Sequence, residues 1–303
     1  MNNIVIAIPT YKRPIMLRKL ILSIADLNID KALIHSVSIL VVDNDIEKTA
    51  EETINKLIIE TDGIHKLYYF NYAVKGLSNV RNELLRKSFE LTSDFIVFID
   101  DDEFVTREWL NELVKTMINN NADVVRGPAF AELDDYIPDH VACWFKRENF
   151  PDNLKLNTLT TGNLILRTSS LQKYNVWFDN RFNKTGSEDS NFGIQLLKNG
   201  ATIYWSAKAI VYETIPENRA NIKWLIIRNY RVASTYSYLL KTEKRYLKLL
   251  KKVIVSFMYV IFGFCTLILM IIPIKLRYWG ILKLSEGVGG LSGLVSILYN
   301  EYK

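Results

Sequence analysis

The sequence contains few cysteines and histidines, which excludes several kinds of site. Among 303 residues there are 2 cysteines, Cys143 and Cys265, far apart in the chain, and 3 histidines that form no cluster. Neither a disulfide framework nor a zinc site can be built from these residues at these spacings. We therefore expect a protein of a reducing compartment.

The sequence also lacks internal repeats, low-complexity tracts and linkers rich in proline or glycine. No signal peptide precedes the strand-like segment NIVIAIPT at residues 3–10, so we expect the polar part of the protein to stay in the cytoplasm. The length allows one large domain with an appendage.

Positive charge is modest overall but is concentrated at residues 241–252, KTEKRYLKLLKK. Directly after this cluster, residues 253–272 form a run of 20 residues without charge, VIVSFMYVIFGFCTLILMII, long enough to cross a bilayer as a helix. A basic cluster beside such a run favours an anionic membrane surface. Binding of DNA or RNA is the rival interpretation, and no nucleic-acid motif accompanies the charge.

Basic residues flank the apolar run on both sides, because Lys275, Arg277 and Lys283 follow Pro273. A single span normally has asymmetric flanks. The pattern therefore favours a re-entrant or in-plane helix, with a full span and a buried core helix as alternatives. Gly289 and Gly293 are spaced for close helix packing, and the tail is also a candidate surface for a homo-oligomer.

Strand-like and helical segments alternate along the rest of the chain. This alternation predicts an α/β fold, in which helices flank a Rossmann-like, mostly parallel sheet and ligands bind at the carboxyl ends of the strands. We expect this domain to span residues 1–235 and a helical, membrane-associated tail to span residues 236–303. Predicted strands are 4–8, 37–42, 66–72, 95–99, 123–126, 163–167, 201–205 and 209–211, and predicted helices are 16–27, 47–60, 77–89, 108–119 and 188–199.

Three carboxylates, Asp100, Asp101 and Asp102, follow the apolar strand predicted at 95–99. Side chains alternate along a strand, so Asp100 and Asp102 should project to one side and Asp101 to the other. Adjacent anions repel one another unless a cation lies among them. A hard divalent cation held together with a diphosphate would meet that need, and a solvated acidic turn is the alternative.

A second acidic group, Glu188 and Asp189, opens the predicted helix in GSEDSNFGIQLLKNG, residues 186–200. Phe192, Leu196 and Leu197 would form the buried face of this amphipathic helix. Carboxylates are favoured at helix N-termini, so helix capping is the alternative to a catalytic role.

Together these motifs resemble the family 2 glycosyltransferases, bacterial enzymes with the GT-A (nucleotide-diphospho-sugar transferase) fold. The resemblance covers about residues 3–235 and is nearest to the branch that assembles exopolysaccharide, capsule or O-antigen repeats on a lipid carrier. The motifs are IPTYKRP at 8–14, VVDND at 41–45, GLSNVRN at 76–82, FIDDDE at 98–103, TGN at 161–163, GSED at 186–189 and ETIPENR at 213–219.

The resemblance implies an inverting, metal-dependent glycosyltransferase of the hexosyltransferase type. Asp102 would be the direct ligand of Mn²⁺ or Mg²⁺, which neutralises charge on the departing nucleoside diphosphate. An aspartate such as Asp43 would accept a hydrogen bond from uracil, although a role in a turn or as a helix cap is its alternative. Arg81 could instead pair with a surface carboxylate. The implied donor-nucleotide residues are Pro9, Thr10, Arg13, Asp43, Arg81, Asp100 and Asp101.

By the same resemblance, Asp189 is the general base that takes the proton of the acceptor hydroxyl, with Glu188 beside it. The segment around the acceptor or diphosphate would comprise Gly162, Asn163, Glu213 and Arg219. Many members carry histidine where this chain has Glu213, so the third protein ligand of the metal stays open. The expected donor is a UDP-sugar, with GDP and dTDP as alternatives, and the expected acceptor is a lipid-linked saccharide at the cytoplasmic face of the plasma membrane.

Two other functions share the broad fold. A sugar nucleotidyltransferase would carry a glycine-rich loop near the N-terminus, and IPTYKRP contains no glycine. A non-catalytic membrane scaffold would be expected to lose acids from one of the two groups. Both Asp102 and Asp189 are present, which favours the enzyme.

Overall fold

In the computed structural model, which describes residues 1–134, 136–268 and 273–301, the chain divides into two units. The first comprises Met1–Glu132, Lys146–Arg181 and Glu188–Thr214, and the second comprises Leu133–Phe145, Phe182–Ser187 and Ile215–Lys303. Each unit is therefore built from separate stretches of chain. The boundary that we expected near residue 235 falls inside helix α8 (Ile222–Thr242).

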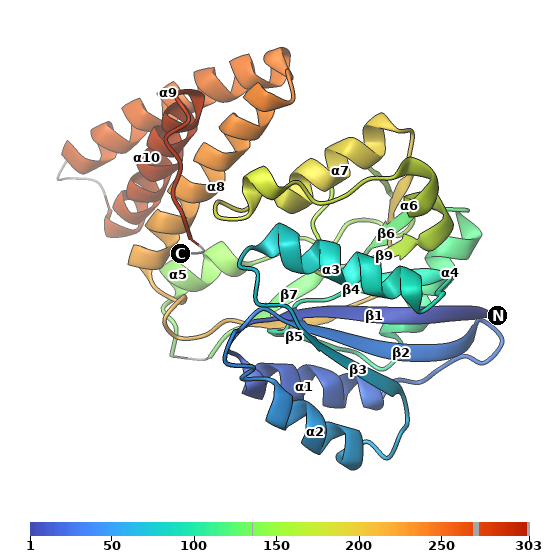
Figure 1. Cartoon of the computed structure of the whole chain (residues 1–303). Helices are drawn as coiled ribbons and strands as arrows, with labels where there is room; N and C mark the ends of the chain where they lie inside the picture. The colour runs from blue at the N-terminus through green and yellow to red at the C-terminus, as the bar shows by residue number, and fades with distance from the viewer. Residues whose placement is uncertain (135, 269–272, 302–303) are drawn as a thin grey trace. The chain divides into compact units, whose positions relative to one another are not determined.

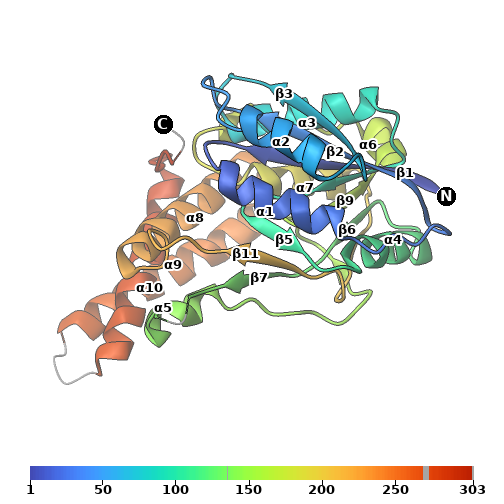
Figure 2. The ribbon, with the colours of Figure 1, turned by 90° about the horizontal axis from the view of Figure 1, so that it is seen from below.

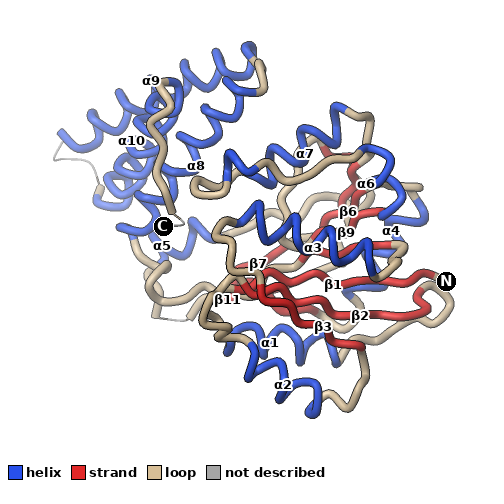
Figure 3. The backbone as a smooth tube through the Cα atoms, viewed as in Figure 1, coloured by secondary structure: helices blue, strands red, loops and turns tan. Residues whose placement is uncertain are grey.

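The first unit is built on a mixed sheet of eight strands in the order β3-β2-β1-β4-β9-β6-β10-β8 (Figures 1 and 3). The first four strands in this order, β3, β2, β1 and β4, are parallel to one another. Strand β9 is antiparallel to both β4 and β6, and β8 is antiparallel to β10. The predicted mostly parallel sheet is confirmed. The strands are β1 (Asn2–Thr10), β2 (Ile34–Asp43), β3 (Lys66–Asn71), β4 (Phe95–Phe98), β6 (Val124–Arg126), β8 (Lys155–Leu156), β9 (Leu164–Arg167) and β10 (Ile203–Trp205).

Helices cover both faces of this sheet, as Figure 1 shows for α1 and α2 on one face and α3 and α7 on the other. Side chains alternate along β1, so Ile4, Ile6 and Ile8 join one apolar core while Val5 and Ala7 join the other. The first core includes α1 (Pro14–Ala25), α2 (Glu51–Glu60) and α4 (Trp109–Asn119). The second includes α3 (Leu77–Glu90), α6 (Thr168–Tyr174) and α7 (Glu188–Lys198).

A small second sheet lies beside the first and has the strand order β5-β11-β7 (Figure 2). Its strands are β5 (Glu103–Val105), β11 (Val211–Thr214) and β7 (Ala129–Glu132). The antiparallel register of β5 and β11 pairs Glu103 with Glu213. Residues 131–158, which we expected to be loop-like, contribute part of β7, strand β8, the short helix α5 (Asp139–Ala142) and the 3-10 turn η1 (Cys143–Phe145).

The second unit contains α8 and two further long helices, α9 (Tyr246–Ile268) and α10 (Ile274–Leu294). Added Cβ atoms on Gly289 and Gly293 would lie 2.3 and 2.1 Å from the backbone oxygens of Tyr230 and Ser234 in α8. The close helix packing predicted for these two glycines is therefore confirmed. Among the described residues, α9 is the one helix long and apolar enough to cross a membrane. Residues 269–272 of the predicted apolar run lie outside the described residues.

Candidate active site

The acidic triplet lies where β4 ends, at the carboxyl edge of the parallel strands. Asp101 and Asp102 are buried, with exposed fractions of 5% and 8%. Arg13 Nη1 lies 2.9 Å from Asp101 Oδ1 and 2.8 Å from Asp102 Oδ2, and Thr10 Oγ1 donates to Asp101 Oδ2 at 2.9 Å. The predicted alternation of Asp101 and Asp102 is wrong, because the strand ends at Phe98 and both acids belong to a turn that faces Arg13.

Burial has a measurable electrostatic consequence at this turn. It raises the pKa of Asp101 to about 6, although the positive charge of Arg13 opposes the shift and the negative charge of Asp102 adds to it. Desolvation disfavours the charged form of a carboxyl group, and a like charge nearby acts in the same direction. The turn therefore favours an additional cation.

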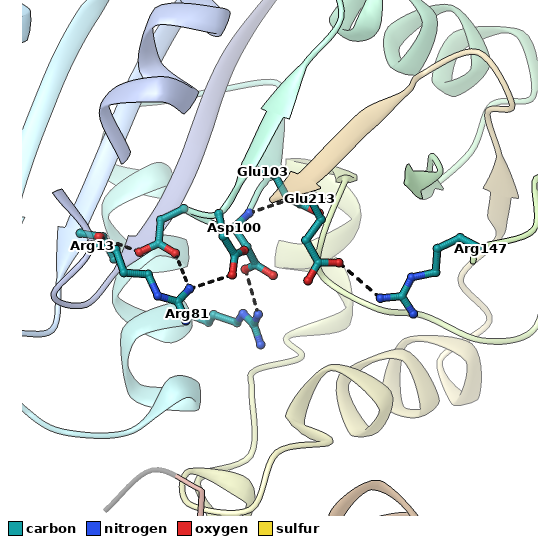
Figure 4. A network of polar contacts seen from close by, with 9 residues as sticks. Arg13, Arg81, Asp100, Glu103, Arg147 and Glu213 are labelled. Atoms are coloured by element: carbon teal, nitrogen blue, oxygen red, sulfur yellow. Dashed lines mark hydrogen bonds and ion pairs between the residues drawn. The ribbon is translucent and has the colours of Figure 1, made fainter. Parts of the chain in front are cut away.

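Arg81 in α3 connects the two acidic groups that were singled out in the sequence. Its Nη1 donates to Glu188 Oε1 in α7. Its Nη2 lies 3.2 Å from Asp100 Oδ1, as Figure 4 shows. Arg81 and Glu188 are 4% and 3% exposed, so this ion pair is buried, whereas the Asp100 side chain is 38% exposed. A nucleotide contact of Arg81 stays a prediction. Burial raises the pKa of Glu188 to about 7, against the opposing charge of Arg81.

Asp189 differs from its neighbour Glu188 in exposure and in partners. Its side chain is half-buried, and its Oδ1 accepts a hydrogen bond from the Ser190 N–H at 2.6 Å. Burial raises the pKa of Asp189, while Arg81 and, more weakly, Arg126 lower it. In the part of the chain that the structure describes, Asp189 forms no ion pair. A partly buried carboxylate without an ion-pair partner is suited to exchange a proton with a bound hydroxyl.

Arg126 is a site residue that was not singled out from the sequence. It ends β6, and its guanidinium lies over the Trp205 ring and donates from Nη2 to Thr160 Oγ1. Burial lowers the pKa of Arg126 to about 10, whereas the nearby charge of Asp189 raises it. A basic residue at the end of a short strand is common, and only the fold brings it close to Asp189.

Glu103 and Glu213 extend the acidic group through the small sheet. Arg147 Nη2 lies 3.3 Å from Glu213 Oε2, and the N–H of Asp100 donates to Glu103 Oε2 at 3.0 Å (Figure 4). Burial raises the pKa of Glu103 well above its usual value, and the negative charges of Asp100, Asp102 and Glu213 add to this shift. Sequence reasoning missed Glu103 and Arg147. Glu103 adjoins the triplet, whereas Arg147 lies in a stretch without a recognisable motif.

Gly162 leaves room for these carboxylates. A Cβ atom at this position would lie 2.9 Å from Glu103 Oε1 and 3.6 Å from Asp100 Oδ2. The structure therefore places Gly162 at the acidic group, and a larger residue there would have to displace Glu103. Its expected place beside the acceptor or diphosphate stays a prediction.

The side chain of Asn163 lies in the core. Its Oδ1 accepts from Trp109 Nε1 at 2.7 Å, and its Nδ2 donates to the carbonyls of Pro128 and Ala209 at 2.8 and 2.6 Å. The side chain is fully buried. The amide is thus fully used by contacts to three parts of the core, and the expected acceptor contact of Asn163 stays a prediction.

The remaining predicted residues are placed as follows. Pro9 lies near the end of β1 beside Val42. Asp43 is fully buried, and its carboxylate accepts from the N–H groups of Asp45 and Ala50 and from the Tyr69 hydroxyl. Those bonds hold the turn between β2 and α2 and leave a uracil contact untested. Arg219 belongs to the second unit, and its role stays a prediction.

The donor set fits a hard divalent cation that is bound mainly through a substrate. Among the described residues, no group of three or more His, Cys, Asp or Glu side chains could hold a metal ion without other ligands. Mg²⁺ is commonly held by one or two carboxylates together with substrate phosphates. Asp102, with Asp100 and Glu213 nearby, supplies oxygen ligands of that kind, and buried anions with raised pKa values would gain from such a cation.

Two family profiles match the sequence. The profile of glycosyl transferase family 2 matches residues 5–174, and that of glycosyl transferase family group 2 matches residues 95–289. The succinoglycan biosynthesis protein ExoM of Rhizobium meliloti (strain 1021) is 31% identical over 244 residues, which are 78% of this chain and 75% of that protein.

Solved glycosyltransferase structures share the fold. S. aureus TarS 1-349 in complex with UDP-GlcNAc superposes with a TM-score of 0.57 at 14% identity, covering 96% of this chain and 90% of that one. Mannosyltransferase PcManGT from Pyrobaculum calidifontis, in complex with GDP-Man and Mn²⁺, gives a TM-score of 0.66 at 14% identity, covering 97% and 87%. The fold is that of GT-A enzymes, and the chain belongs to glycosyl transferase family 2.

Proposed function

We propose that the protein is an inverting, metal-dependent glycosyltransferase. It transfers a hexose-type sugar from a nucleotide-diphosphate donor, preferably a UDP-sugar, to a hydroxyl of a lipid-linked saccharide during synthesis of a cell-surface polysaccharide. The observation that carries this proposal is the bridge made by Arg81, which joins Asp100 of the first acidic group to Glu188 of the second. One site can thereby hold a donor diphosphate and activate an acceptor.

The first acidic group would receive the donor. Thr10, Asp43 and Pro9 line the strand ends where a nucleotide would bind, with Asp100 and Asp101 next to them. Arg13 and Arg81 lie at the acidic triplet. Both are close enough to pair with the diphosphate when it binds at this edge of the sheet. A bound Mn²⁺ or Mg²⁺ would supply charge neutralisation for the leaving nucleoside diphosphate, with Asp102 as its protein ligand.

Asp189 would act as the general base. Glu188 is buried and paired with Arg81, whereas Asp189 is only partly buried and has no ion-pair partner among the described residues. The acceptor hydroxyl would lose its proton to Asp189 as its oxygen attacks the anomeric carbon and the bond to the diphosphate breaks. A single displacement of this kind inverts the configuration at that carbon.

The names of the relatives support the substrate classes in this proposal. ExoM is a succinoglycan biosynthesis protein, which supports a polysaccharide pathway. The structures named with UDP-GlcNAc and with GDP-Man and Mn²⁺ support a nucleotide-sugar donor and a divalent metal. The basic and apolar tail supports a location at the cytoplasmic face of the membrane, where a lipid-linked acceptor would be available.

Release of nucleoside diphosphate from a panel of nucleotide-sugars, with Mn²⁺ and membrane lipid extract as the source of acceptor, tests the proposal. We expect turnover of one UDP-sugar by the full chain, its loss with EDTA, and a product of inverted anomeric configuration by NMR. A matched control is Asp62→Asn, which changes an exposed aspartate away from the site. Equal turnover by Asp189→Asn, or a retained configuration, would refute the assignment.

A further inference from the structure

Helix α9 has two faces of different chemistry. On one face, Ser256, Gly263 and Thr266 are buried. The opposite face exposes an apolar stripe of large side chains at helical spacing. We define this apolar stripe as Leu247, Leu250, Ile254, Met258, Ile261 and Ile268, with exposed fractions from 53% to 82%. An exposed apolar surface of this extent marks an interaction site.

Charged residues border the apolar stripe at only one end of the helix. Lys248 and Lys251 are exposed in the first turns of α9, and residues 253–268 carry no charge. Lysines beside an exposed apolar surface complement a bilayer that contains anionic lipids, because the ammonium groups can stay at the level of the headgroups. A protein partner would offer no comparable reason for this separation of charge from apolar surface along one helix.

The buried face of α9 is tied closely to α10, so the two helices would enter a membrane together. A Cβ atom on Gly280 would lie 1.8 Å from Thr266 Oγ1, and one on Gly287 would lie 2.6 Å from the Ser256 carbonyl. These contacts run the length of the antiparallel pair. They show that neither helix can separate from the other without losing close packing along the whole interface.

The charges of α10 favour an α9 that lies flat on the membrane over an α9 that crosses it. Lys283 Nζ lies 2.8 Å from Glu286 Oε2, and Lys252 Nζ of α9 lies 3.4 Å from Glu286 Oε1. Arg277 adds another charge to the same helix. If α9 crossed the bilayer, α10 beside it would bring these groups into the hydrocarbon, where charged side chains are strongly disfavoured. When α9 lies flat, only its outer face is immersed.

We propose that α9 lies in the plane of an anionic membrane surface, with the apolar stripe immersed at the boundary between headgroups and acyl chains. Amphipathic helices of this type sit roughly 5–10 Å into that boundary. Trp279, which is exposed and packs edge-on against Phe262, is of the residue type enriched at this level. This docking does not rest on the proposed catalytic activity, because it involves no substrate.

Depth measurements with single cysteines test the geometry directly. Cys143→Ser and Cys265→Ser remove both native thiols, and Ile254→Cys, Ile261→Cys or Ile268→Cys then places one fluorophore along the apolar stripe. Quenching by spin-labelled lipids in vesicles of phosphatidylcholine and phosphatidylglycerol should give the same shallow depth at all three positions. A probe at Ile59→Cys, an exposed isoleucine of α2 outside the tail, should not be quenched. A deep probe at residue 261 between shallower probes at 254 and 268 would overturn the proposal.

Charge variants test the identity of the partner. Lys248→Gln with Lys251→Gln should weaken binding to phosphatidylglycerol vesicles about 25-fold, since each lysine near an anionic surface contributes about fivefold. The control pair Lys66→Gln with Lys208→Gln should change binding little. The full chain should resist extraction by high salt and leave only in detergent. Release by salt alone, or a disulfide-linked dimer of Ile261→Cys without vesicles, would show that the stripe does not face lipid.

Discussion

Arg81 and Glu188 form a buried ion pair that joins α3 to α7 at the centre of the candidate active site. Through its other nitrogen, Arg81 also reaches Asp100. The two acidic groups are therefore parts of one network, and the position of each depends on the same guanidinium.

Removal of this guanidinium should harm stability and activity together. Arg81→Met leaves Glu188 buried without its partner, which typically costs about 3–5 kcal/mol in the free energy of unfolding. Denaturant unfolding and turnover measure the two effects. The double variant Arg81→Met with Glu188→Leu should regain most of the stability but none of the activity. Recovery of activity by the double variant would show that Arg81 serves the fold alone.

The pH dependence of turnover should report the Glu188 and Asp189 pair. A general base works in its deprotonated form, and burial raises the pKa of both carboxyl groups, with that of Glu188 at about 7. Activity should therefore fall on the acidic side, beginning at a higher pH than for an ordinary aspartate base, because burial raises the pKa of Asp189. Because the Arg126 charge lowers the pKa of Asp189, Arg126→Gln should move this acidic limb to higher pH, and Arg126→Lys should restore it. If the acidic limb of the pH profile is unchanged in Arg126→Gln, then Arg126 does not influence the pKa of the general base.

The acidic turn should govern metal-dependent donor binding. We expect Asp102→Asn to abolish the increase in UDP affinity that Mn²⁺ produces in calorimetry, because Asp102 is the proposed protein ligand of the metal. EDTA should have the same effect on the unchanged protein. Asp62→Asn serves as the control. If UDP binds equally well with EDTA, the donor is held by Arg13 and Arg81 without a metal.

Asn163 should matter for stability rather than for catalysis. Asn163→Ala removes three hydrogen bonds to Trp109 and to two backbone carbonyls in the core, and unsatisfied buried groups cost about 1–3 kcal/mol each. Asn163 also has a left-handed backbone with φ of 54°. Asn153→Ala, at an exposed position with φ of 61°, controls for that backbone effect. If Asn163→Ala and Asn153→Ala lower the free energy of unfolding equally, the cost comes from the left-handed backbone and not from the lost hydrogen bonds.

Much of the fold was predictable because its signals are local. Apolar runs ending near Thr10, Asp43 and Phe98 correspond to β1, β2 and β4, and helical periodicity located α1 and α3. Because these strands are parallel, their carboxyl ends were expected at the same edge of the sheet. The short strands β5, β7 and β8 were not predicted, since two to four residues give too little periodicity for a pattern to be recognised.

The chemistry of the site was predictable in part. The two acidic groups are visible in the sequence, but their connection through Arg81 joins residues 107 positions apart in the chain. The pairing of Glu103 with Glu213 depends on the register of β5 and β11. The core hydrogen bonds of Asn163 could not be predicted, because a motif shared with a family shows that a residue is needed, and not whether it serves the substrate or the core.

The most direct test of the account is the rate of sugar transfer by Asp189→Asn, compared with its affinity for the donor. The amide keeps the shape of the carboxylate and removes its basicity, so transfer should fall by about 10²–10⁴-fold, as is typical when a general base is lost. Donor affinity should stay close to that of the unchanged protein, because Asp102, Arg13 and Arg81 are intact. A variant that retains more than about a tenth of the original rate would contradict the assignment of Asp189 as the base.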